Sequence, residues 1–100
     1  MYRELLNELE TEPSLNGLMR YEAILKPHFP EEIRDVFFVY LRRQMSYSRS
    51  RNTYQNLVGL LKKMRSYPDG REMAQALADE WKRNYARRSA MLDELRHAGF

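Results

Sequence analysis

Apolar residues recur at helical spacing through almost the whole chain, and this periodicity restricts the fold more than any other feature. Between residues 52 and 100, three amphipathic segments follow one another with very short turns between them. In the second of these segments Met73, Leu77 and Trp81 stand at four-residue steps, which places them on one face of a helix. No segment alternates apolar and polar residues over the length of a strand without fitting the helical period better. The sequence therefore predicts an all-α protein.

Capping residues and helix breakers divide this pattern into six short helices. Pro30 followed by Glu31 and Glu32 is a strong start signal, because proline needs no amide partner in the first turn and acids complement the helix dipole. The expected helices cover residues 2–11, 15–27, 30–46, 50–66, 70–85 and 89–98. The other expected boundaries are a stop before Pro13, N-caps at Ser14, Asp69 and Ser89, a break within residues 46–51 and a stop at Gly99. Short helices joined by short links are expected to pack as antiparallel helical hairpins.

The apolar stripes predict one core with Trp81 near its centre. A chain of 100 residues with 43% hydrophobic residues can bury one core, so residues 1–100 are expected to form a single domain. An aromatic residue at the centre of an apolar stripe dominates the packing of a small helical domain. Trp81 is therefore expected to be buried against the preceding helix, where the candidate partners are Tyr54, Leu57 and Leu61.

The composition favours a soluble, cytoplasmic domain. No run of about 18 apolar residues exists, and residues 1–30 carry charges throughout, so we expect neither a membrane span nor a secretory leader. The chain has no cysteine, which excludes disulfides, zinc–thiolate sites and a thiol nucleophile within it. A lack of disulfides fits a reducing compartment.

Residues that could support catalysis or metal binding are few and badly spaced. His28 and His97 are the only histidines, and neither has a second ligand at the spacing that metal sites use. Ser46, Ser48 and Ser50 lack a nearby histidine that could act as a base. We therefore expect no enzyme activity, no metal or other cofactor and no small-molecule substrate.

The positive charge is concentrated in the second part of the chain. Residues 1–35 hold eight acids against four bases, whereas residues 36–100 hold thirteen bases against six acids. Two basic clusters surround the turns after the third and fifth helices, and they consist of Arg42, Arg43, Arg49 and Arg51, and of Lys82, Arg83, Arg87 and Arg88. Because both turns come at the C-terminal ends of helices separated by one hairpin, the two clusters can lie at the same side of the domain.

These basic clusters have two explanations. Their arginines could hold phosphates while Tyr47, Tyr54 or Tyr85 stacks on a base. Alternatively, the basic side chains complement the negative ends of helices, and the tyrosines belong to the edge of the core.

The last half of the chain carries a pattern of tyrosines, leucines and basic residues over two helices. Its positions are Tyr54, Leu57, Leu60, Leu61, Lys62, Lys63, Tyr67, Leu77, Tyr85, Arg87, Arg88, Ala90, Leu92, Asp93, Glu94 and Leu95. This pattern resembles the helical C-terminal region of bacterial SWIM-type zinc-finger proteins, in which a helix of the form "Y..(V/A)..LL+KL" leads to a closing "Y.RR.A(L/M)LDEL" helix. The resemblance implies a helical appendage of a larger protein. It carries over no zinc ligand, because the family's zinc site needs cysteines and this chain has none.

Two functions of different classes are compatible with these observations. The third helix is apolar at Phe38 and Val39 in addition to its inward stripe, which is typical of a helix at the centre of a domain or at an interface. This pattern favours a protein-interaction domain whose partner is another protein or a second copy of the chain. The alternative is an accessory nucleic-acid-binding domain that uses the two basic clusters.

Overall fold

A computed structural model describes residues 2–11 and 14–100, and every regular element in this part of the chain is a helix. The elements in chain order are α1 (Tyr2–Thr11), α2 (Leu15–Leu25), α3 (Pro30–Tyr47), α4 (Arg51–Lys63), the 3₁₀ turn η1 (Met64–Ser66), α5 (Gly70–Asn84) and α6 (Ser89–His97). The predicted all-α class and the six helices are confirmed. The main departure is that residues 64–66, expected within the fourth helix, form a separate 3₁₀ turn.

Several of the predicted helix ends have the expected caps. Ser14 Oγ accepts a hydrogen bond of 3.1 Å from the Gly17 amide, and Pro30 occupies the first turn of α3. Gly99 ends α6 and has a φ of 87°. The Gly99 amide donates to the Arg96 carbonyl, and the Phe100 amide donates to the Leu95 carbonyl. This pair of bonds is the usual glycine-terminated helix end. The predicted stop before Pro13 lies outside the described residues.

At two of the predicted N-caps the expected side chain makes no capping hydrogen bond. Asp69 adopts a left-handed conformation, with φ 55°, and its side chain makes no capping hydrogen bond. Ser89 is the first helical residue of α6, and Arg88 occupies the N-cap position without capping. The Arg88 guanidinium instead donates to the Met45 carbonyl of α3 at 2.7 Å.

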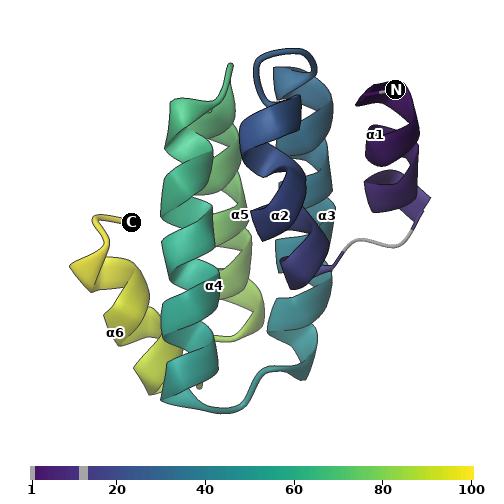
Figure 1. The fold of residues 1–100 in the computed structure, drawn as a ribbon. Helices are drawn as coiled ribbons and strands as arrows, with labels where there is room; N and C mark the ends of the chain where they lie inside the picture. Colours follow the sequence, from purple (N-terminus) through teal and green to yellow (C-terminus); the bar gives the residue numbers. More distant parts are fainter. Residues whose placement is uncertain (1, 12–13) are drawn as a thin grey trace.

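The helices alternate in direction along the chain, and α3 lies in the middle of the arrangement (Figure 1). It packs against α1, α2, α4 and α5, while α6 packs against the other side of α4. The loops after α3 and α5 both lie at the lower end of the molecule in this view. The molecule measures 44 × 24 × 18 Å, and none of its described helices has the length and apolar character needed to cross a membrane.

One core runs through the molecule, and Trp81 belongs to it. Trp81 and Phe37 are the largest side chains that are fully buried, with exposed fractions of 1% and 0%. The predicted burial of Trp81 is therefore confirmed. Its expected partners on α4 stay a prediction, since α5 makes its main contacts with α3 and η1.

A polar cluster fixes η1 against α2. Lys26 Nζ donates to Ser66 Oγ at 2.7 Å and lies 4.3 Å from the centre of the Tyr67 ring, and Lys63 pairs with Glu22 at 3.0 Å. The Tyr67 hydroxyl and Oε2 of Glu22 are buried without a hydrogen-bond partner among the described residues. Burial, and after it the negative charge of Glu22, raise the pKa of Tyr67.

We expect Tyr67→Phe to increase resistance to alkaline unfolding. The pKa of Tyr67 is higher in the folded than in the unfolded protein, so the folded state favours the protonated phenol. The stability of the fold is therefore intact below the ordinary tyrosine pKa of about 10 and falls as the pH rises beyond that value. Removing an unpaired buried hydroxyl should also raise the free energy of unfolding at neutral pH, by up to about 1 kcal/mol. Urea melts at pH 7 and above pH 10 measure both effects. An alkaline loss as large in the variant as in the wild type would contradict the assignment.

Candidate interaction surface

The face of α3 that points away from the core carries a sequence of acidic, apolar and basic side chains. We call it the α3 outer face and define it by six residues, which are Glu31, Asp35, Phe38, Val39, Arg42 and Arg43. Five of these side chains are exposed, and Phe38 is half-buried. They fall at spacings of three and four residues, so they follow one side of the helix over about three turns.

The apolar middle of this face is the predicted interface of Phe38 and Val39. A shallow hollow of about 260 Å³ lies here, and its lining comes from Phe38, Val39, Arg42 and Arg43. Val39 is 47% exposed, which is high for a valine on the central helix of a small domain. The structure therefore places this apolar pair at the surface, next to two arginines.

The charged residues at the two ends of the α3 outer face are oriented by neighbouring groups. Arg34 donates from Nε and Nη2 to Asp35 Oδ1 at 3.1 and 3.0 Å, and from Nη1 to the Pro68 carbonyl at 2.7 Å. Arg42 donates from Nε and Nη2 to the two carboxylate oxygens of Glu80 at 3.0 and 2.9 Å. Asp35 and Arg42 stay largely accessible, with side-chain exposures of 58% and 60%. These contacts fix the two side chains in position and leave them open to solvent.

Two contacts bring residues of both basic clusters to the same end of α3. The ion pair between Arg42 and Glu80 joins α3 to α5, and the hydrogen bond from Arg88 to the Met45 carbonyl joins the same end of α3 to the start of α6. The sequence predicted this proximity but not the acidic and carbonyl partners that the arginines find there.

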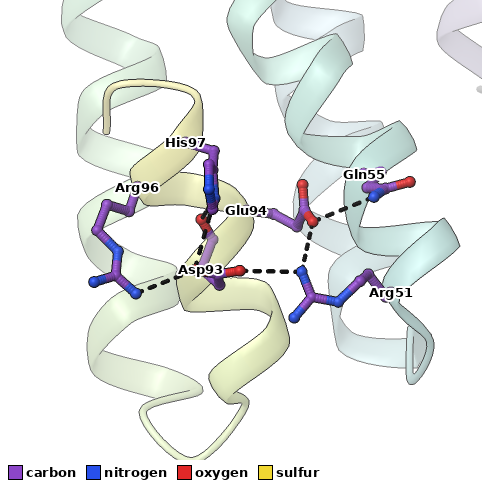
Figure 2. A network of polar contacts seen from close by, with 6 residues as sticks. All are labelled: Arg51, Gln55, Asp93, Glu94, Arg96 and His97. Carbon is purple, nitrogen blue, oxygen red and sulfur yellow. Dashed lines mark hydrogen bonds and ion pairs between the residues drawn. The ribbon is translucent and has the colours of Figure 1, made fainter.

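Arg51 binds two acids of α6, as Figure 2 shows. Its Nη1 donates to Asp93 Oδ2 at 3.1 Å and to Glu94 Oε1 at 2.8 Å, and Gln55 donates to the same Glu94 oxygen at 3.3 Å. His97 Nδ1 lies 2.8 Å from the Asp93 carbonyl oxygen. This network attaches α6 to the first turn of α4.

Most of the other predicted phosphate-binding residues are also engaged within the molecule. Arg49 donates to the carbonyls of Ser46 and Ser48, and Lys82 donates to the Phe100 carbonyl. The other three residues are exposed, and their side chains make no ion pair or hydrogen bond with any described residue; they are Arg43, Arg83 and Arg87. Five of the eight basic residues therefore join parts of the fold to one another.

The tyrosines near these clusters offer little surface to a nucleic-acid base. Tyr54 is buried and donates from its hydroxyl to the Ser48 carbonyl at 3.2 Å. The Arg88 guanidinium lies over the Tyr85 ring, with its central carbon 4.1 Å from the ring centre. Tyr47 is the accessible ring of the three, at 75% exposure. The hypothesis that Tyr54 stacks on a base is wrong, because the core covers its ring.

The histidines take part in local contacts. His28 stacks on Tyr2 with ring centres 4.4 Å apart, and His97 lies beside Asp93 on α6. Among residues 2–11 and 14–100, no three or more His, Cys, Asp or Glu side chains gather in an arrangement that could hold a metal ion.

We expect the Asp93 network to weaken in acid. The hydrogen bond from Arg51, followed by the charges of His97, Arg51 and Arg96, lowers the pKa of Asp93 below its ordinary value. A lowered pKa stabilises the fold above the unfolded value of about 3.9, and this contribution disappears as the pH falls through the folded value. Asp93→Asn should therefore be less stable than the wild type at pH 7 and equal to it near pH 2. A difference that is independent of pH in urea melts would contradict this account.

Comparison of the chain with protein-family models, with curated proteins and with solved structures finds no match.

Proposed function

We propose that this chain is a non-catalytic, cytoplasmic protein-interaction domain that binds its partner through the α3 outer face. The observation that carries the proposal is the apolar pair of exposed Val39 and half-buried Phe38, which forms a shallow hollow with Arg42 and Arg43 on the central helix. An apolar centre with charged residues around it is the usual composition of a protein interface. The helices behind α3 hold this face in a fixed shape, so little ordering is needed on binding.

The alternative, a nucleic-acid-binding domain, receives less support from the basic clusters. Arg42 and Arg51 are paired with carboxylates, and Arg88 donates to a main-chain carbonyl, so binding a phosphate would require these contacts to be exchanged. A phosphate track also needs neighbouring bases that are not interrupted by acids. Here Glu80, Asp93 and Glu94 lie directly beside basic residues of the first cluster.

We expect the chain to have no measurable affinity for generic DNA or RNA at about 50 mM salt, where electrostatic binding is strong. Fluorescence anisotropy with a labelled oligonucleotide measures this directly. Arg43, Arg83 and Arg87 are the bases to reverse in a control variant, because their side chains make no ion pair or hydrogen bond with a described residue. Tight, salt-sensitive binding that is lost in this triple variant would favour the nucleic-acid function.

We further propose that the chain is the helical appendage of a larger protein of the SWIM zinc-finger type. The support is the motif in the last half of the sequence, including Tyr54, Tyr85 and residues 92–95. Asp93 and Glu94 of that motif contact Arg51 in α4, so part of the motif has a role in joining its two helices.

Proximity labelling in cells tests the proposed function with two matched variants. Val39→Glu places a charge in the centre of the α3 outer face, and Ile24→Glu makes the same change on α2 at a side chain of similar exposure, 44% against 47%. We expect the proteins labelled by the wild type to be retained with Ile24→Glu and lost with Val39→Glu. The same set of labelled proteins for all three forms would contradict the proposal.

A further inference from the structure

We propose that the partner on the α3 outer face is a second copy of this chain, bound with its α3 antiparallel to the first. This inference rests on the proposed function and adds the identity of the partner. It starts from the order of charges along α3, which is acidic, apolar and then basic. A face of this kind is complementary to itself when it is turned around.

The positions of the charges favour a two-fold axis beside Val39. Asp35 lies four residues before Val39 and Arg43 lies four residues after it, so each is about 6 Å along the helix from the axis. An antiparallel copy therefore brings Asp35 of each chain next to Arg43 of the other. The two copies of Val39 meet at the centre, with Phe38 beside them.

Two exposed residues of α3 that lie further from the axis match in the same way. Glu31 lies eight residues before Val39 and Tyr47 lies eight residues after it, about 12 Å from the axis on each side. Both side chains are exposed, and the Tyr47 hydroxyl can donate a hydrogen bond to the Glu31 carboxylate of the other copy. This arrangement would give the 75% exposed ring of Tyr47 a partner.

A parallel pairing is disfavoured by the same residues. It would place Asp35 against Asp35 and Arg43 against Arg43, and like charges across an interface repel. Arg42 can contribute to the antiparallel helix pair although it binds Glu80. Its ion pair with Glu80 uses Nε and Nη2, so the donors of Nη1 stay free. Antiparallel helices also place their dipoles in opposite directions.

The proposed contact is only one helix wide, and this small area limits the expected affinity of the dimer. A face of this size falls at the low end of specific interfaces, below about 1,200 Å² of total buried surface, where complexes are weak and transient. The exposed ion pairs add sensitivity to salt, because the screening length falls from about 10 Å at 0.1 M to about 3 Å at 1 M. The dimer should therefore weaken at high salt and dissociate readily on dilution.

Sedimentation equilibrium of the purified chain tests this dimer. We expect the mass to rise from monomer toward dimer with concentration at about 50 mM salt, and the dissociation constant to increase at least about threefold near 0.5 M salt. Val39→Glu should weaken the dimer at least about tenfold, because two unpaired acids would meet at the axis, while Ile24→Glu should leave it unchanged. A chain that stays monomeric at millimolar concentration, or a dimer unaffected by Val39→Glu, would overturn the inference.

Charge reversal tests which residues face each other. Asp35→Arg and Arg43→Glu should each weaken self-association, because both variants place like charges across the axis. Mixed in equal amounts they should form a heterodimer with affinity near that of the wild type, since both opposite-charge pairs are then restored. A mixture no stronger than the separate variants would overturn the pairing.

Single cysteines test the antiparallel direction, and the absence of native cysteine makes the result unambiguous. With a bismaleimide whose span matches packed helices, about 8 to 10 Å, Val39→Cys should cross-link to its own copy. Ser46→Cys lies seven residues further on, so its two copies should be about 21 Å apart along the axis and should not cross-link. Cross-links from both variants would mean a parallel pair, and a cross-link from neither would remove the proposed axis.

The proximity labelling experiment separates the two proposals. Loss of labelled proteins with Val39→Glu, combined with a chain that is monomeric in sedimentation, would leave the α3 outer face as an interface for a different protein. Failure of both experiments would remove the interface itself.

Discussion

Trp81→Ala is expected to lower the free energy of unfolding by roughly 3 to 5 kcal/mol, the range for truncating a large buried aromatic side chain. Trp81 is 1% exposed and is the largest fully buried side chain of the core. Its loss leaves a cavity in the part of α5 that the rest of the fold surrounds. Chemical denaturation followed by circular dichroism measures the effect.

Trp81→Phe is the matched control for this prediction. The indole Nε1 is buried without a hydrogen-bond partner among the described residues, so phenylalanine keeps most of the apolar volume and removes an unpaired donor. We expect this variant to lose less than half of what the alanine variant loses. An unchanged denaturation midpoint in Trp81→Ala would show that Trp81 is not a core residue.

Gly70→Ala is expected to destabilise the protein by roughly 2 to 4 kcal/mol, because it forces atoms into an occupied space. Gly70 begins α5 and is buried against η1. A methyl group there would overlap the carbonyl oxygen of Met64 and lie 2.9 Å from its carbonyl carbon. These are main-chain atoms, so they cannot move aside as a flexible side chain would.

Gly59→Ala is the control, and it should have the opposite sign. Gly59 lies within α4, is exposed, and has no atom within 4 Å of the place where a methyl group would be added. Alanine is favoured over glycine in a helix by up to about 1 kcal/mol, so this variant should be more stable than the wild type. Equal melting temperatures for the two glycine variants would contradict the close packing of α5 on η1.

The fold was largely predictable because local signals and packing agree along most of the chain. The spacing of Met73, Leu77 and Trp81 predicted a buried stripe, and Leu77 and Trp81 are buried while Met73 is half-buried. Pro30 and Ser14 predicted two helix starts, and both lie where expected. In each of these places the residue's own backbone preference is enough to fix the structure.

The predictions failed at two helix starts. Asp69 was expected to cap α5, but it adopts a left-handed backbone and its side chain makes no capping hydrogen bond. Arg88 occupies the cap position before Ser89, and its guanidinium donates to the carbonyl of Met45, 43 residues earlier in the chain. No pattern within one helix contains that information.

The candidate surface was predicted only in part for the same reason. Phe38 and Val39 were identified from the width of the apolar arc of α3, and the structure leaves Val39 exposed. Glu31 was explained by the helix dipole and Asp35 received no role, because their relation to Arg43 emerges only when one side of α3 is seen to be free. The acidic partners of Arg42 and Arg51 lie 38 and 42 residues away in the sequence.

The most direct test of the antiparallel dimer through the α3 outer face is an amide NMR spectrum of the labelled chain, recorded from millimolar to low micromolar concentration. We predict that chemical shifts change with concentration for residues 31–47 on the outer side of α3 and stay constant on α6. Shifts that do not change with concentration, or changes centred on the arginine contacts between α4 and α6, would contradict the account.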